Sequence, residues 1–305
     1  DHHEETVRAD ALSILDKLIW HYDEPFADAS AVPTYYVSQA ARRHVTVALS
    51  GDGGDENLAG YRRYFHDCLQ YRARSLFPES LRRSVFGTLG RWYPKLDWAP
   101  RCLRAQATFR ELSRGDVEGY FYSISATKPE YKRTLLSDDF QRSLNGYDSR
   151  ILFDDYYSRP KTTDHLSRLQ YLDIKTYLVD DILVKVDRAS MANSLEVRSP
   201  LLDHVLMELM ARMPSSLKLK GGVGKYIFKK SLEGILPHNI LTRRKHGFGV
   251  PVAEWFRKDL KRTSAAVLLK DDPMGLLNTK AIVELWDKHQ SGLRDFSTPD
   301  RKSVV

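Results

Sequence analysis

The sequence predicts an α/β fold with a parallel sheet, followed by a mostly helical region. Residues 44–50 (HVTVALS) form a short, almost wholly apolar stretch, which is typical of a strand covered on both faces of a parallel sheet. A glycine-rich loop at 51–55 and a predicted helix follow at once, which gives the strand–loop–helix order of α/β proteins. From about 65 to 220 the segments are amphipathic and rich in Arg and Leu, so we expect helices and no strand there.

Two helices are predicted before this strand, because apolar residues recur there at three- and four-residue intervals. The first covers residues 6–22, and one face of it carries Val7, Leu12, Leu15, Leu18, Ile19 and Tyr22. A loop at 23–33, with prolines at both ends, leads to the second helix at 34–43.

Later helices follow from the same spacing. Residues 166–200 are predicted to form two helices that break near 179–181 and stop at Pro200. Further helices are expected at 225–236 and 280–290.

Composition limits the classes of function. The chain has 305 residues and a net charge of +7, but the basic residues form short clusters far apart and no nucleic-acid-binding motif accompanies them. We therefore expect no nucleic-acid partner. No window holds the run of about 18 apolar residues that spans a bilayer, and the polar first residues do not resemble a signal peptide. Cys68 and Cys102 lack metal-site spacing and are expected to be buried thiols in a reducing, cytoplasmic setting.

The loop after the strand, residues 50–56 (SGDGGDE), combines glycines with acids. Glycines let backbone N–H groups approach a ligand closely, and the acids suit a Mg²⁺ ion that lies between them and phosphate groups. The acids could also hold the amino group of a substrate. Alternatively, the loop is a turn before a helix whose acidic first turn suits the helix dipole.

A second glycine cluster precedes the helix predicted at 225–236. Gly221, Gly222 and Gly224 come before Lys225, without the residues that a Walker phosphate loop requires. Lys225 is therefore placed at a helix start, where its charge suits a phosphate. The alternative is a solvated turn.

Five segments in order make the chain resemble the glutamine-hydrolysing asparagine synthetases. They are residues 23–39 (DEPFADASAVPTYYVSQ), 47–64 (VALSGDGGDENLAGYRRY), 177–204 (YLVDDILVKVDRASMANSLEVRSPLLDH), 221–232 (GGVGKYIFKKSL) and 243–257 (RRKHGFGVPVAEWFR). The resemblance covers residues 1–295 as a partial synthetase domain, with an α/β part at about 1–64, a helical part at about 65–295 and a disordered tail at 296–305.

The resemblance implies an ATP pyrophosphatase core whose cofactors are ATP and Mg²⁺. In this family the side-chain carboxylate of aspartate is adenylated, and ammonia released from glutamine then gives asparagine, AMP and pyrophosphate. It also implies that the family's glutaminase domain and SGGxDS phosphate loop precede these residues in a longer parent enzyme, so these residues alone are expected to bind ATP weakly. A homodimer is compatible with the family.

The resemblance also assigns roles to individual residues. Leu49, Ser50 and Gly51 would border the nucleotide, and Asp55 matches a Mg²⁺ ligand position. Asp52 matches the acid linked to formation of the acyl-adenylate, although many members have Glu there. Lys225 matches the lysine that binds the phosphates and stabilises the developing charge.

Other assignments leave alternatives open. Glu196 either orients catalytic groups or forms a buried ion pair with Arg198. Asp181 and Lys185 are four residues apart, which favours a helix salt bridge.

Two further features are less specific. Asp28 and Ser30 lie in a loop that could meet the substrate, whereas Gly247 and Gly249 are interpreted as a structural turn.

Two alternative functions remain. The chain could belong to an amidotransferase of the same fold that acts on another carboxylate in polysaccharide or secondary-metabolite synthesis. It could also be a catalytically inactive binding module. A tyrosine in place of Asp52 would have favoured a β-lactam synthetase-like cyclase, and the aspartate argues against one.

Overall fold

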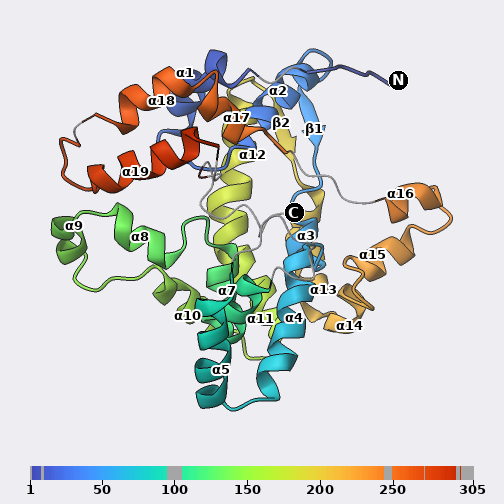
Figure 1. The fold of residues 1–305 in the computed structure, drawn as a ribbon. Helices are drawn as coiled ribbons and strands as arrows, with labels where there is room; N and C mark the ends of the chain where they lie inside the picture. The colour runs from blue at the N-terminus through green and yellow to red at the C-terminus, as the bar shows by residue number, and fades with distance from the viewer. Residues whose placement is uncertain are drawn as a thin grey trace. The chain divides into compact units, whose positions relative to one another are not determined.

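The computed structural model describes residues 2–7, 10–94, 105–243, 249–270, 272–292 and 296 (Figure 1). The chain divides into two compact units. The first unit combines residues 1–62 with 166–252, and the second combines 63–165 with 253–305. The predictions for Cys102, for Gly247 and for the tail beyond Phe296 lie outside the described residues.

A two-stranded parallel sheet joins the two segments of the first unit. Strand β1 (Val47–Leu49) pairs with β2 (Glu196–Arg198), with Ala48 opposite Val197 (Figure 1). The predicted strand and its parallel pairing are confirmed. The prediction of no strand between 65 and 220 is wrong, because β2 has one apolar residue between two charged ones and so no apolar run to mark it. The expectation of two covered faces is also wrong, since Leu49 is 73% exposed.

Helix α1 (Ala11–Tyr22) begins later than predicted. The carboxylate of Asp10 accepts hydrogen bonds from the backbone N–H groups of Leu12 (3.1 Å) and Ser13 (3.3 Å), and this N-cap fixes Ala11 as the first residue of the helix. The predicted apolar face is only partly right: Leu12 and Ile19 are exposed. The buried face consists of Ala11, Ile14, Leu18 and Tyr22.

Helix α2 (Ala31–Arg42) begins before Pro33, within the segment predicted as a loop. Proline is tolerated in the first turn of a helix because that turn needs no N–H donor. The rest of the predicted loop, from Asp23, precedes the helix.

A continuous helical segment replaces the two predicted helices. It runs as α11 (His165–Asp173), a π-helix (Ile174–Leu183) and α12 (Val184–Met191). The predicted break near 179–181 is therefore wrong: the wider π-helical turns accommodate the irregular spacing without interrupting the chain. The segment stops at Met191 rather than at Pro200, which lies in a 3-10 turn (Pro200–Leu202) after β2.

Short helices complete the first unit. They are α3 (Gly54–Asn57), α13 (His204–Arg212), α14 (Ser215–Lys218), α15 (Tyr226–Ser231) and α16 (His238–Thr242). The helix predicted at 225–236 is confirmed as α15, but it ends earlier. The core of this unit includes Leu169, Leu172, Leu178 and Ala189 of the long helical segment, all at most 2% exposed.

Helices joined by loops make up the described part of the second unit, and Leu136 and Leu277 form an isolated antiparallel bridge there. Its helices are α4 (Arg62–Ser75, whose first residue belongs to the first unit), α5 (Glu79–Trp92), α6 (Gln106–Leu112), α7 (Asp116–Ile124), α8 (Pro129–Leu135), α9 (Asp138–Ser143), α10 (Arg150–Ser158), α17 (Val252–Arg257, from Ala253), α18 (Lys261–Leu268) and α19 (Thr279–Gln290). The last confirms the helix predicted at 280–290.

A buried polar cluster lies in this second unit. His165 Nε2 lies 2.6 Å from Asp67 Oδ1, and Arg74 Nη2 lies 3.6 Å from Asp67 Oδ2. Cys68 is half-buried, and burial together with the neighbouring Asp67 raises the pKa of its thiol to about 12.

Among the described residues, no helix has both the length and the apolar character needed to cross a membrane.

Candidate functional site

The acidic glycine loop leaves β1 and enters α3 through a tight backbone turn. Gly53 has a φ of +83°, and a Cβ at this position would lie 2.0 Å from Leu202 Cδ2. Only glycine fits here, so the turn needs this residue for its own packing. Ser50 Oγ donates a hydrogen bond to Asp52 Oδ2 (2.8 Å) and lies 2.9 Å from Ser199 Oγ. These contacts hold Asp52 at the carboxyl end of the parallel strands.

The second glycine loop docks directly against the end of the first. The backbone N–H of Lys225 donates to the carbonyl oxygen of Leu58 (2.8 Å). A Cβ on Gly224 would lie 2.2 Å from the carbonyl oxygen of Ala59, so this close approach requires glycine. Lys225 itself has a φ of 54°, a left-handed conformation that a residue other than glycine rarely adopts. The structure thus places Lys225 at the start of α15, as predicted, and in a strained conformation.

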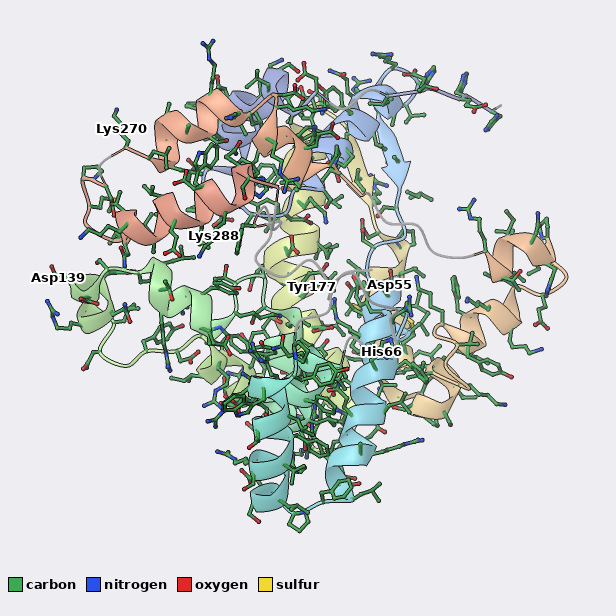
Figure 2. All side chains as sticks on the ribbon, in the orientation of Figure 1. Asp55, His66, Asp139, Tyr177, Lys270 and Lys288 are labelled. Carbon is green, nitrogen blue, oxygen red and sulfur yellow. The ribbon has the colours of Figure 1, made fainter. Side chains whose placement is uncertain are left out.

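An ion pair joins the two loops. Lys225 Nζ lies 3.0 Å from Asp55 Oδ1, and their side chains are 27% and 19% exposed. Asp55 lies in α3 (Figure 2). A Cβ on Gly60 would lie 1.9 Å from Asp55 Oδ1 and 2.4 Å from Lys225 Cε, so this glycine provides the space for the pair. Two residues that the sequence analysis proposed separately are therefore in contact.

A second layer of polar side chains lies behind this pair, and the sequence analysis missed it. Glu56 is 1% exposed and accepts a hydrogen bond from Tyr61 Oη at 2.6 Å. Burial raises the pKa of the Glu56 carboxyl, although the hydrogen bond from Tyr61 opposes the shift. Gln170, which is 3% exposed, donates from Nε2 to the backbone carbonyl of Glu56 (2.6 Å). Glu56 was visible in the motif, whereas nothing in the local sequence pattern marks Gln170.

A second charge pair joins Lys185 of α12 to Asp28 in the loop before α2. Lys185 Nζ lies 2.6 Å from Asp28 Oδ2, a partner that the four-residue spacing to Asp181 did not predict. Ser30 donates to Asp28 from its backbone N–H (2.9 Å) and from Oγ (2.7 Å). Burial alone would raise the pKa of Asp28, but the Lys185 ammonium and the hydrogen bonds from Ser30 together hold this pKa below its usual range.

Removing Lys185 is expected to destabilise the fold at neutral pH. The change Lys185→Met leaves the Asp28 carboxylate without its cation and should lower the free energy of unfolding by about 1–3 kcal/mol. This loss is smaller than that for breaking a fully buried pair, because both side chains are partly exposed. Because the folded-state pKa of Asp28 is depressed, the stabilisation is present above the unfolded-state pKa of about 4 and disappears as the pH falls through the folded-state value. Urea unfolding should therefore show a difference that shrinks on acidification.

The exposed Lys175 supplies the control, because Lys175→Met removes one positive charge from the same helical segment. This variant should lose little stability at either pH. A Lys185→Met variant as stable as the wild type at neutral pH would show that the pair contributes no net stability.

Other predicted site residues are not brought into the ion pair. Glu196 pairs with Arg198 at 2.7 Å, but both side chains are more than half exposed, so the alternative of a buried pair is wrong. Leu49 is exposed, and a Cβ on Gly51 or Gly249 would have no described heavy atom within 4 Å. The described residues therefore leave Leu49 and Gly51 uncovered.

The described residues can supply a divalent cation with few ligands. No group of three or more His, Cys, Asp or Glu side chains among them could hold a metal ion. Mg²⁺, however, is commonly bound by one or two carboxylates together with phosphate oxygens and water. The Asp55 carboxylate, held beside a cation and partly exposed, suits such a shared site.

Comparison with known proteins gives a consistent result. The asparagine synthase family model matches residues 1–303. Asparagine synthetase [glutamine-hydrolyzing] 1 of Bacillus subtilis is 29% identical over 287 residues, which is 93% of this chain and 43% of that protein. Asparagine synthetase [glutamine-hydrolyzing] 3 of the same organism is 37% identical over 141 residues, 43% of this chain and 22% of that protein. Amidase chyE of Penicillium rubens is 23% identical over 304 residues, 90% of this chain and 43% of that protein. The chain thus spans less than half the length of these relatives.

Proposed function

The chain belongs to the asparagine synthase family, and from this we propose that it carries the ATP-dependent, amide-forming part of such an enzyme. The proposed reaction begins when an oxygen of the aspartate side-chain carboxylate attacks the α-phosphorus of ATP. Pyrophosphate leaves, and an acyl-adenylate remains. Ammonia derived from glutamine then attacks the acyl carbon, and AMP departs as asparagine forms. Activation is needed because a carboxylate is a poor electrophile.

The contact between Asp55 and Lys225 is the observation that supports this proposal most strongly. It joins an acid and a base from two glycine loops, and close backbone approaches fix both loops. Asp55 would hold Mg²⁺, which would neutralise phosphate charge when bound. Lys225 would contact the departing pyrophosphate, where a preorganised positive charge lowers the barrier most.

The remaining assignments are compatible with the geometry. Asp52 is held by Ser50 close to the strand ends, where it would act on the acyl-adenylate. Leu49 and Gly51 border open space, which would leave room for the nucleotide. Glu196 would act only from the exposed surface of β2, so its proposed orienting role has the weakest geometric support.

A second candidate is amidation of a different carboxylate. The similarity to a protein named as an amidase, over most of this chain, supports a wider range of reactions among related proteins. A catalytically inactive binding module is the third candidate, and the intact pair of Asp55 and Lys225 argues against it.

An assay of the full-length gene product tests the proposal. With ATP, Mg²⁺ and either glutamine or ammonia, aspartate should give pyrophosphate and AMP in equal amounts, together with asparagine. A panel of other amino-acid and sugar carboxylates, assayed in parallel, would identify the second candidate if one of them replaced aspartate. The absence of pyrophosphate release with every carboxylate would contradict both enzymatic proposals.

A further inference from the structure

The buried amide of Gln170 uses both of its ends. Its Nε2 donates to the backbone carbonyl of Glu56 at 2.6 Å, and its Oε1 accepts from Lys218 Nζ at 3.1 Å. Gln170 and Lys218 are each 3% exposed. Burying an amide and an ammonium group is unfavourable unless both are hydrogen-bonded, and an apolar side chain would fill the same space without that cost. The polar pair therefore calls for a reason beyond packing.

The two partners of Gln170 lie on the two loops that carry the candidate site. Glu56 directly follows Asp55 in α3, so a bond to its carbonyl fixes the backbone that supports the Asp55 side chain. Lys218 ends α14 and leads into the glycine loop that delivers Lys225. Gln170 lies on a third element, α11, whose neighbouring Leu169 is fully buried in the core.

These bonds close a ring of contacts. On one side the ring runs from Asp55 through Glu56 and Gln170 to Lys218. On the other side the ion pair and the bond from the Lys225 N–H to Leu58 connect the same loops directly. The direct contacts alone would let both loops move together relative to the core. A bridge to α11 fixes them to a rigid element.

From this we propose that Gln170 is a positioning residue: it holds Asp55 and Lys225 at their separation by tying both loops to α11. The inference rests on the proposed function for its effect on catalysis, although the positioning itself does not. Charges that are placed before the reaction stabilise developing charge most effectively, and a displacement of about 1 Å can lower a rate on the order of 100-fold.

Three variants of the full-length gene product separate positioning from packing. Gln170→Leu keeps the side-chain size and removes both bonds, whereas Lys218→Met leaves the first and removes the second together with the other interactions of Lys218. The control is Asn193→Leu, because Asn193 Nδ2 also bonds two backbone carbonyls, those of Tyr35 (3.2 Å) and Ala189 (2.9 Å), away from the two loops. Thermal unfolding should show a loss of stability in both Gln170→Leu and Asn193→Leu, and a larger one in Gln170→Leu because Gln170 is buried whereas Asn193 is only partly buried.

The expected difference lies in local dynamics and in the rate of the chemical step. Amide hydrogen exchange at Lys225 and Gly60 should be about 10-fold faster in Gln170→Leu than in Asn193→Leu, because both N–H groups bond to backbone carbonyls within the two loops. Single-turnover pyrophosphate release should fall by about 10- to 100-fold in Gln170→Leu, and less in Lys218→Met. The KM for ATP should change little, while the Mg²⁺ concentration for half-maximal rate should rise.

The outcomes are distinct. Equal amide exchange in Gln170→Leu and Asn193→Leu, with unchanged Mg²⁺ dependence, would overturn the inference and leave Gln170 as a packing residue. If Gln170→Leu does not fold, Lys218→Met decides by the same comparison. If the wild type releases no pyrophosphate with any carboxylate, the proposed function fails, but the exchange measurement still decides whether Gln170 positions the loops.

Discussion

Replacing Lys225 by alanine is expected to raise the barrier to acyl-adenylate formation by roughly 2–4 kcal/mol, the usual cost of removing one preorganised electrostatic donor. This corresponds to a loss of rate of about 30- to 1000-fold. Alanine is as strained as lysine in the left-handed conformation of this position. The change therefore removes the charge without altering the backbone strain of the loop. Pyrophosphate release in a single turnover of the full-length gene product measures the effect.

Binding of ATP should suffer much less than the rate. The charge of Lys225 matters most when negative charge accumulates on the leaving pyrophosphate, whereas the ground state would be held by other contacts as well. We therefore expect a large fall in the rate and a small change in the dissociation constant of Mg-ATP, which calorimetry would measure.

Lys230 on the same helix provides the matched control. It is exposed, and its ammonium group pairs with Glu233 at 2.9 Å. Lys230→Ala removes one positive charge from α15 and should leave pyrophosphate release within about twofold of the wild type. If Lys225→Ala also kept the wild-type rate, Lys225 would only be a partner for Asp55 in the folded chain.

The candidate site shows what a single sequence can predict. The motifs around Asp55 and Lys225 were recognisable because glycines and charges cluster at the ends of predicted elements. Their contact was not predictable from spacing, since it depends on Gly60 and Gly224 allowing two backbones to approach. The glycines in the motifs were visible, but which of them had to be glycine became clear only from the packing.

The elements that sequence analysis missed have physical reasons. Strand β2 is three residues long and is held by the bonds from Ser50 N–H to the Arg198 carbonyl and from Glu196 N–H to the Thr46 carbonyl. Such a short strand has no periodicity of its own. The π-helix disturbed the three- and four-residue spacing in the same way as a break would. Gln170 bonds to a backbone carbonyl 114 residues away, and a backbone acceptor leaves no trace in residue type.

Charge pairing was also set by tertiary structure. The spacing of Asp181 and Lys185 predicted a helix salt bridge, but a π-helix precedes Lys185 and changes which side chains share a face. Lys185 pairs with Asp28, which lies in the loop before α2. The choice between partners four residues apart and partners far apart in the sequence could not be made from the sequence.

The two acids of the first glycine loop are expected to respond differently to Mg²⁺ when each is replaced by asparagine. The structure gives them different surroundings: Asp55 contacts Lys225, whereas Asp52 accepts a hydrogen bond from Ser50. Asp55→Asn should raise the Mg²⁺ concentration needed for half-maximal rate by about 10-fold or more, because a neutral amide oxygen is a poorer ligand for a hard cation. Excess Mg²⁺ should restore part of the rate.

Asp52→Asn should lower acyl-adenylate formation by about 100-fold with an unchanged Mg²⁺ requirement, since its proposed role is at the acyl group rather than at the metal. No Mg²⁺ concentration should then restore the rate. The asparagine side chain can still accept the Ser50 hydrogen bond, and at position 55 it can still accept from Lys225, so neither variant need disturb the loop. Pyrophosphate release against Mg²⁺ concentration, with thermal unfolding to confirm folding, measures both effects. If both variants gave wild-type curves, the two acids would only provide favourable charge at the N-terminus of α3. If both variants had the same defect, both acids would act at the same step and the proposed division of roles would be refuted.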